Sequence, residues 1–251
     1  QTAKHHFIQH KSITENYSVG DFEREAIALL DTLFEHHDIV IMVGGSGLYV
    51  DAVTKGLDEF PSVDSHIREN LNQELNLSGI VRLQEKLRQL DKSYYDTVDL
   101  YNPHRLIRAL EICIATGKPY SSFLNQPRKK RNFTTITIGL QTDRELIYDN
   151  INRRVDLMLT NGLEAEAKLL LPHKQLNALQ TVGYKEFFSY FDGKWEYETA
   201  VSEIKKNTRR FAKRQLTWFR KNQNTQWLNA LKSSEEHVRL ITEVIKKQNI
   251  T

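Results

Sequence analysis

Hydrophobic residues recur at helical spacing through most of the chain. Residues 21–36 carry one such stripe, from Phe22 to Leu33, and the predicted helix there can be capped by Gly20 or Asp21. The same spacing predicts further helices over residues 48–53, 67–77, 80–90, 92–98, 103–116, 143–159, 163–171, 183–191, 196–221 and 235–248. Asn102 and Pro103 mark one helix start, and Gly117 marks its end.

Three short apolar runs predict strands, at residues 39–43, 134–140 and 225–228. The first run is continuously apolar, as is typical of a strand covered on both faces. Gly44, Gly45 and Ser46 follow it, and a helix comes next. Strand, glycine turn and helix in this order build α/β sheets, so the sequence predicts an α/β fold.

Composition narrows the class of protein. Of the 251 residues, 39% are hydrophobic and 27% are charged, which argues against disorder throughout the chain. No apolar run approaches the roughly 20 residues that a membrane helix needs. Cys113 is the only cysteine, which excludes an intrachain disulfide and a Cys-based zinc site. We therefore expect a cytoplasmic protein without a membrane anchor.

The net charge of the chain is small, but positive charge is concentrated in one segment. The net charge is only +3, yet residues 205–221 hold eight basic side chains and no acidic one. An apolar stripe lies opposite them on the predicted helix, a pattern that fits binding to a nucleic-acid backbone. The alternative is a solvated helix face, although such a run would repel itself without a polyanion. Trp218 could stack a base, but its spacing fits a core position first.

Three smaller patterns could bind phosphate. Arg144, Arg153 and Arg154 follow a predicted strand and could reach a diphosphate at the sheet, and the alternative is surface charge. The glycine turn before residues 48–53 could let a ligand approach a helix N-terminus, with Ser46 as a hydrogen-bonding group. The alternative is that Ser46 only caps the helix. Arg105 and Arg108 are three residues apart, so they face the same way and could clamp a phosphate. The alternative is a solvated face that pairs with carboxylates such as Glu111.

Six motifs then occur in one order along the chain. They are Tyr17-Ser-Val-Gly-Asp-Phe22, Val43-Gly-Gly-Ser-Gly-Leu-Tyr49, Asn102-Pro-His-Arg-Leu-Ile-Arg-Ala-Leu-Glu111, Thr116-Gly-Lys118, Val182-Gly-Tyr184 and Lys213-Arg-Gln-Leu-Thr-Trp-Phe-Arg220. Each is weak alone, but together they resemble the bacterial tRNA dimethylallyltransferases, also called tRNA isopentenylpyrophosphate transferases. The resemblance covers about residues 5–228.

The resemblance implies an α/β, P-loop-NTPase-like parallel sheet core, incomplete at its N-terminus, with a helical insertion. It places the core at residues 1–154, with a helical segment at about 58–124. A helical tRNA-binding insertion follows at about 155–200, and residues 201–251 return to the core. The implied reaction transfers a dimethylallyl group from dimethylallyl diphosphate to the exocyclic amine of the adenine 3′-adjacent to the tRNA anticodon. Mg²⁺ assists, the adenine is flipped out, and we expect a monomer.

The resemblance also implies roles for residues. Arg154 matches an arginine that grips the diphosphate. The positions that match tRNA contacts are Ser46, Arg68, His104, Arg105, Leu106, Ile107, Arg108, Gln180, Thr181, Val182, Gly183, Tyr184, Lys185, Lys213, Arg214, Gln215, Leu216, Thr217, Trp218, Phe219 and Arg220. Ser46 stands where the family usually has Thr, His104 where Gln is common, and Lys185 where Arg is found.

Two family features have no match in this sequence. One is the glycine-rich phosphate loop that ends in Gly-Lys-Thr or Gly-Lys-Ser, and the other is the general-base Asp that follows it. We therefore assign no catalytic residue, and we expect the 251 residues alone to be inactive or severely impaired. An adenine-nucleotide prenyltransferase, a nucleotide-kinase-like enzyme and a non-enzymatic RNA-binding protein remain alternatives, which the salt dependence of RNA binding would separate.

Overall fold

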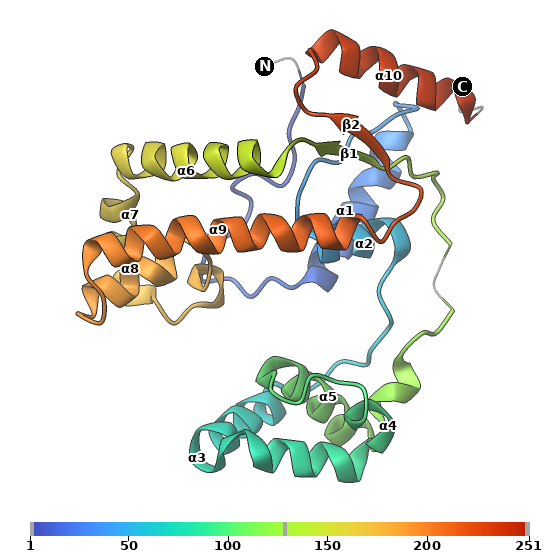
Figure 1. Cartoon of the computed structure of the whole chain (residues 1–251). Helices are drawn as coiled ribbons and strands as arrows, with labels where there is room; N and C mark the ends of the chain where they lie inside the picture. The colour runs from blue at the N-terminus through green and yellow to red at the C-terminus, as the bar shows by residue number, and fades with distance from the viewer. Residues whose placement is uncertain (1–2, 128–129, 249–251) are drawn as a thin grey trace. The chain divides into compact units, whose positions relative to one another are not determined.

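The computed structural model describes residues 3–127 and 130–248, and the chain forms two compact units (Figure 1). The first unit contains residues 1–54 and 132–251, and the second contains residues 55–131. Within the described ranges, no helix is both long enough and apolar enough to cross a membrane. The second unit is thus a continuous segment of the sequence, whereas the first is built from two.

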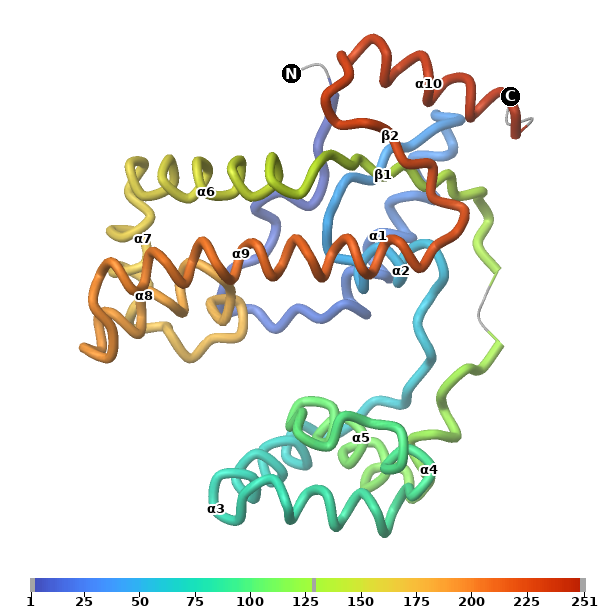
Figure 2. Tube along the Cα trace, in the orientation of Figure 1, coloured from blue at the N-terminus to red at the C-terminus, as the bar shows by residue number. Residues whose placement is uncertain are grey.

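A small parallel sheet lies in the first unit. Strand β1, Ile138–Gln141, pairs with strand β2, Gln226–Asn229, with Gly139 opposite Trp227. A Cβ atom at Gly139 would lie 2.6 Å from the Trp227 ring, so this register needs glycine. Between the strands the chain runs out through helix α6 and returns along helix α9 (Figures 1 and 2). The expected α/β class with a parallel sheet is confirmed, and two of the three predicted strands form.

The strand predicted at residues 39–43 is wrong. This segment has no regular secondary structure, and Ile41 and Val43 are 82% and 90% exposed. A strand exists only through hydrogen bonds to a neighbouring strand, and the described sheet contains β1 and β2 alone. The apolar run therefore identifies residues suited to a buried strand, but it does not supply their partner.

Two helices lie on either side of this segment. Helix α1, Val19–Phe34, is capped by Ser18, whose side chain accepts a hydrogen bond from the Asp21 backbone, while the Asp21 side chain accepts one from the Ser18 backbone. The cap is therefore Ser18 and not the predicted Gly20 or Asp21, because a hydroxyl can satisfy an otherwise unpaired amide. Helix α2, Gly47–Lys55, begins directly after the glycine turn.

The remaining helices of the first unit form a packed group beside the sheet. They are α6 Arg144–Thr160, α7 Leu163–Leu170, α8 Tyr184–Phe191 and α9 Tyr197–Phe219, with short 3₁₀ turns at Leu171–His173 and Asn177–Leu179. Their shared core consists of Val155, Leu163, Ala167, Phe187 and Ile204. Helix α10, Ser234–Lys247, follows β2. Residues 155–200 belong to this helical group, and their assignment as a tRNA-binding insertion stays a prediction.

The second unit is helical. It contains α3 Ser65–Leu90, α4 Lys92–Tyr95, α5 Pro103–Thr116 and a 3₁₀ turn at Tyr120–Phe123. Helix α5 packs against α3, and its start at Asn102 and end at Gly117 are as predicted. Gly79, with φ of 74°, breaks α3 between the two helices that the sequence predicted there. The core is made of Leu71, Leu83, Leu87, Leu106, Ile107, Ala109 and Leu110.

Candidate nucleic-acid interface

The basic run on α9 is neutralised at one end only. Lys205 pairs with Asp156 at 2.5 Å, and Lys206 pairs with Glu203 at 2.6 Å. From residue 209 to residue 221, none of the six basic side chains pairs with a carboxylate in the described part of the chain. Positive charge that no carboxylate of residues 3–127 or 130–248 pairs with therefore covers the C-terminal half of α9 and the turn that follows it.

Aromatic rings and amides hold some of these cations without cancelling their charge. Arg209 donates to the Asn152 side chain at 2.8 Å and lies over the Tyr148 ring. Arg214 lies over Phe211, with the guanidinium carbon 5.6 Å from the ring centroid, and Lys221 lies over Trp218 at the same distance. Such contacts restrict the side chains and leave their N–H groups able to meet an anion.

The end of α9 also contacts the glycine turn at the start of α2. The Gln215 amide donates to the Gly45 carbonyl oxygen at 2.8 Å, and the Trp218 indole donates to Asp51 at 3.0 Å. A Cβ atom at Gly47 would lie 2.5 Å from the Trp218 Cγ, so the ring lies directly against this glycine. Trp218 is 39% exposed and is not the core residue that its spacing indicated.

Ser46 lies in the same turn. Its side chain is exposed, and its carbonyl oxygen accepts the first amide hydrogen bond of α2, from Val50 at 3.1 Å. The residue therefore lies at the helix boundary through its backbone, and its side chain faces solvent beside the basic end of α9. The ligand-binding role and the capping role of its hydroxyl both stay predictions.

A buried carboxylate organises the second unit. The Glu111 side chain is only 3% exposed, and it accepts hydrogen bonds from Arg68 Nε at 2.7 Å and Arg68 Nη2 at 2.9 Å. Arg108 also donates to it, from one turn earlier on α5. Burial raises the pKa of Glu111, but the two guanidiniums outweigh this and hold the pKa below its usual range. Glu111 therefore binds both arginines as a carboxylate.

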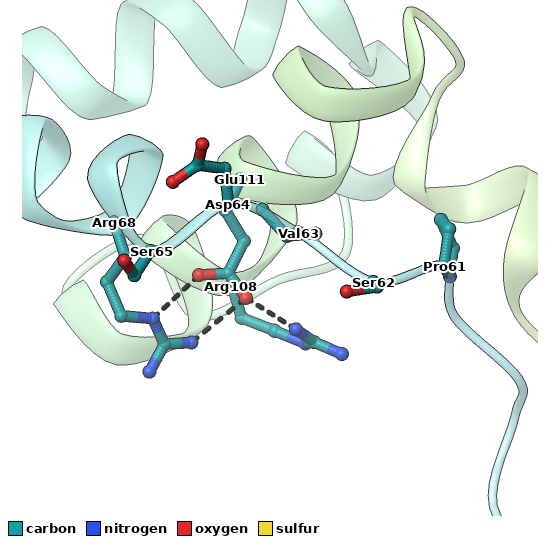
Figure 3. Close-up of a pocket in the computed structure, with 8 residues that line it drawn as sticks. All are labelled: Pro61, Ser62, Val63, Asp64, Ser65, Arg68, Arg108 and Glu111. Atoms are coloured by element: carbon teal, nitrogen blue, oxygen red, sulfur yellow. Dashed lines mark hydrogen bonds and ion pairs between the residues drawn. The ribbon is translucent and has the colours of Figure 1, made fainter.

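A shallow pocket opens beside this triad (Figure 3). Its lining consists of Pro61, Ser62, Val63, Asp64, Ser65, Arg68, Arg108 and Glu111. The sequence offered a pairing of Arg108 with Glu111 on a solvated face, and the pairing exists, but the carboxylate is buried. The participation of Arg68 was missed, because α3 and α5 meet only in the folded chain. An acidic residue three positions after Arg108 was the one local signal.

The segment 104–108 faces two ways. His104 and Arg105 are exposed, whereas Leu106 and Ile107 are 0% and 5% exposed and belong to the core. The side chains of these two apolar residues therefore point into the protein. Their predicted part in tRNA binding can concern only the placement of the neighbouring basic residues.

The segment 180–185 is fixed against α9 by Glu186. This buried carboxylate accepts from the Gly183 amide and from the Asn207 side chain, each at 2.9 Å. Gly183 has a φ of 106°, a conformation that favours glycine. The hydroxyl of the next residue, Tyr184, donates to Glu166 at 2.6 Å, and this bond, with burial, raises its pKa to about 12.

The other predicted positions differ in exposure. Among them, Gln180, Thr181 and Lys185 are exposed, and Val182 is half-buried. On α9, Lys213, Arg214, Thr217 and Arg220 are exposed, whereas Leu216 and Phe219 are half-buried. Arg154 is exposed on α6 beside the buried Val155, and no described carboxylate pairs with it. The structure thus leaves most of the predicted polar positions accessible to a ligand.

Comparison with known proteins agrees with these observations. The family described as IPP transferase matches residues 1–222. A tRNA dimethylallyltransferase of Christiangramia forsetii is 67% identical over 225 residues, which are 90% of this chain and 74% of that protein. The Flavobacterium johnsoniae tRNA dimethylallyltransferase is 55% identical and covers 98% of this chain and 81% of its own length.

Solved structures are also similar to this chain. The full-length tRNA isopentenylpyrophosphate transferase of Bacillus halodurans is 35% identical with a TM-score of 0.66, covering 98% of this chain and 78% of that one. A eukaryotic dimethylallyltransferase acting on tRNA is 22% identical, and its structure superposes with a TM-score of 0.73. The match covers 95% of this chain and 64% of that chain, and it shows a shared fold. On the family match and these identities, the chain belongs to the IPP transferase family.

Proposed function

We propose that this chain modifies tRNA by dimethylallyl transfer, as the names of its relatives state for them. The observation that carries the proposal is the C-terminal half of α9, where basic side chains lack protein counter-ions within the described residues. A polyanion satisfies that surface, and a free nucleotide with its few phosphates does not. The family therefore supplies the reaction, and the charge favours a large RNA over an adenine nucleotide as the acceptor.

The finer reaction is part of the same proposal. The donor is dimethylallyl diphosphate, and the acceptor is the exocyclic amine of the adenine 3′-adjacent to the anticodon. Arg154, exposed and without a described carboxylate partner, is the residue that binds the diphosphate. The adenine has to leave its stack to expose the amine. The enzyme therefore needs contacts with several phosphates of the surrounding RNA backbone.

Two groups of α9 residues then have different tasks. Lys213, Arg214 and Arg220 are exposed and meet RNA phosphates. Gln215 and Trp218 already bond to the glycine turn and α2, so they hold Ser46 and the basic surface in one arrangement. This division refines the sequence-level expectation that the whole 213–220 segment touches tRNA.

Magnesium belongs to the proposal as an expected requirement of the transfer reaction. No three His, Cys, Asp or Glu side chains converge as metal ligands anywhere in residues 3–127 or 130–248. Transfer assays with and without a chelator test the expected requirement.

The central experiment measures binding to an unmodified tRNA as a function of salt. Lys213→Gln combined with Arg214→Gln should weaken binding and lower the slope of log affinity against log salt by about 0.7–0.9 per lost phosphate contact. Lys246→Gln with Lys247→Gln, on exposed positions of α10, is the matched control and should leave the slope unchanged. Equal slopes for both double variants would refute the assignment of α9 to the RNA.

Transfer activity separates an enzyme from an RNA-binding protein. Labelled dimethylallyl diphosphate and tRNA are incubated with the 251-residue chain and with a version extended N-terminally by a relative's phosphate loop. The expectation that the shorter chain is impaired stays a prediction, and comparable rates for the two proteins would contradict it. Activity in neither protein, with normal tRNA binding, would favour the non-enzymatic alternative.

A further inference from the structure

The Arg68–Arg108–Glu111 triad contains more cation than its carboxylate needs. One guanidinium, bound through two hydrogen bonds, satisfies a buried carboxylate, and Arg68 already does so at 2.7 and 2.9 Å. Arg108 adds a second positive charge at Glu111 Oε1, the oxygen that Arg68 Nη2 also binds. The arginine side chains are 55% and 41% exposed, whereas the Glu111 side chain is 3% exposed. The carboxylate is therefore buried, and the two guanidinium groups are exposed to solvent.

The bonds to Glu111 fix both guanidiniums in the lining of the pocket. Glu111 occupies Nε and Nη2 of Arg68 and Nη1 of Arg108, so the remaining N–H groups of both side chains stay free to donate. Arg108 also lies over the Phe60 ring, with its guanidinium carbon 5.0 Å from the centroid. In Figure 3 the two guanidiniums lie on the same side of the Glu111 carboxylate, and the Asp64 carboxylate points away from them.

We propose that Glu111 is a positioning residue, which holds Arg68 and Arg108 so that their free N–H groups receive one backbone phosphate of the tRNA. The inference rests on the proposed function and deepens it by naming how the second unit binds RNA. A long, flexible side chain loses rotamer freedom when it orders around a ligand, and a side chain already held in place does not. Glu111 bears that ordering cost during folding, before the RNA arrives.

An account based on charge alone predicts the opposite change in RNA affinity when Glu111 is removed, and this makes the proposal testable. Glu111 is an anion near the phosphate, so removing its charge should tighten RNA binding if charge were all that mattered. If the carboxylate positions the arginines, its removal should weaken binding although the protein becomes more positive. The direction of the change therefore distinguishes the two accounts.

The test compares Glu111→Gln with Asp64→Asn in the full chain, using unmodified tRNA at fixed salt. Asp64 lines the same pocket and caps α3 by accepting from the His66 amide at 2.9 Å. Asn caps a helix as well as Asp does, so this control removes one negative charge and keeps the structure. We expect Glu111→Gln to weaken binding on the order of tenfold, as for loss of a charged hydrogen bond, and Asp64→Asn to leave it equal or tighter.

Two further variants keep the result clear if Glu111→Gln unfolds the second unit. Arg68→Lys retains the charge and loses the two-point fit to the carboxylate, so it should weaken binding if position matters and leave it unchanged if only charge does. In a chain with Arg68→Gln and Arg108→Gln, adding Glu111→Gln should weaken binding no further. Additional weakening there would overturn the proposal.

The outcomes separate the inference from the proposed function. Salt-insensitive tRNA binding by the unaltered chain would overturn the proposed function and this inference with it. Salt-sensitive binding that Glu111→Gln leaves unchanged or tightens, as Asp64→Asn does, would overturn the inference alone. Weakening by Glu111→Gln and Arg68→Lys, with Asp64→Asn unchanged, would support it.

Discussion

Replacing Gly47 by alanine tests the packing of α9 on the glycine turn. Gly47 is the first residue of α2, and its backbone conformation is open to alanine. In an ordinary helix the change would stabilise the protein by roughly 0.5–1 kcal/mol, because glycine loses more backbone freedom on folding. Here the new Cβ atom would lie 2.5 Å from both Cγ and Nε1 of Trp218.

The magnitude follows from what the ring can do. Trp218 is held by its bond to Asp51 at 3.0 Å, so moving the ring away strains or breaks that bond. Overpacking of this kind costs about 1–3 kcal/mol, which exceeds the gain in helix propensity. We therefore expect Gly47→Ala to destabilise the first unit by about 1–2 kcal/mol.

Tryptophan fluorescence during urea unfolding gives a selective measurement, because Trp195, Trp218 and Trp227 all lie in the first unit. Gly44→Ala is the matched control, since nothing lies within 4 Å of a Cβ atom there, and it should change stability by less than about 0.5 kcal/mol.

The same substitution in a Trp218→Ala background should lose its penalty and become neutral or stabilising. A penalty that persists without the ring would refute the reasoning, as would wild-type stability for Gly47→Ala in the presence of Trp218.

Three other substitutions test single features. Gly117→Ala should cost about 1 kcal/mol in thermal or urea unfolding followed by circular dichroism, because φ of 66° at the end of α5 strains any residue with a Cβ atom. Asn207→Ala should cost about 1–3 kcal/mol in urea unfolding, because buried Glu186 loses a donor. Glu111 has a lowered pKa in the folded chain, so the stability that it contributes is complete above the ordinary pKa of an unfolded glutamate and is lost as the pH falls through the lower folded pKa. When unfolding is measured at decreasing pH, this part of the stability loss should be absent in Glu111→Gln. The same acid dependence in Glu111→Gln as in the unaltered chain would contradict the prediction.

Local signals predicted the helices well. Asn102, Pro103 and Gly117 delimit α5 through capping bonds and a left-handed turn that involve only nearby residues. The apolar run at residues 39–43 gave a wrong strand, because pairing depends on a neighbour that composition cannot specify. The Ser18 cap was missed since Gly20 and Asp21 are also common near helix starts.

The candidate site also has features that the sequence could predict and features that it could not. The charge on α9 is contiguous in sequence, so it was predictable before the fold was known. The triad around Glu111 joins α3 to α5, and the Gln215 bond to Gly45 joins distant parts of the chain. Sequence spacing cannot reveal such pairs, because tertiary packing creates them. The buried side chains of Leu106 and Ile107 likewise show that a motif can match a binding segment while part of it faces the core.

The parallel pairing of β1 with β2 has a consequence for synthesis on the ribosome. Ile138 pairs with Gln226, so the whole of α6 to α9 must be made before the first strand finds its partner. Contacts this distant in sequence form late, whereas α3 and α5 can dock as soon as both have emerged. The nascent chain therefore completes its second unit first, and β1 waits for β2, its partner in the described sheet, until α6 to α9 have been made. That interval is when a ribosome-associated chaperone has most to protect.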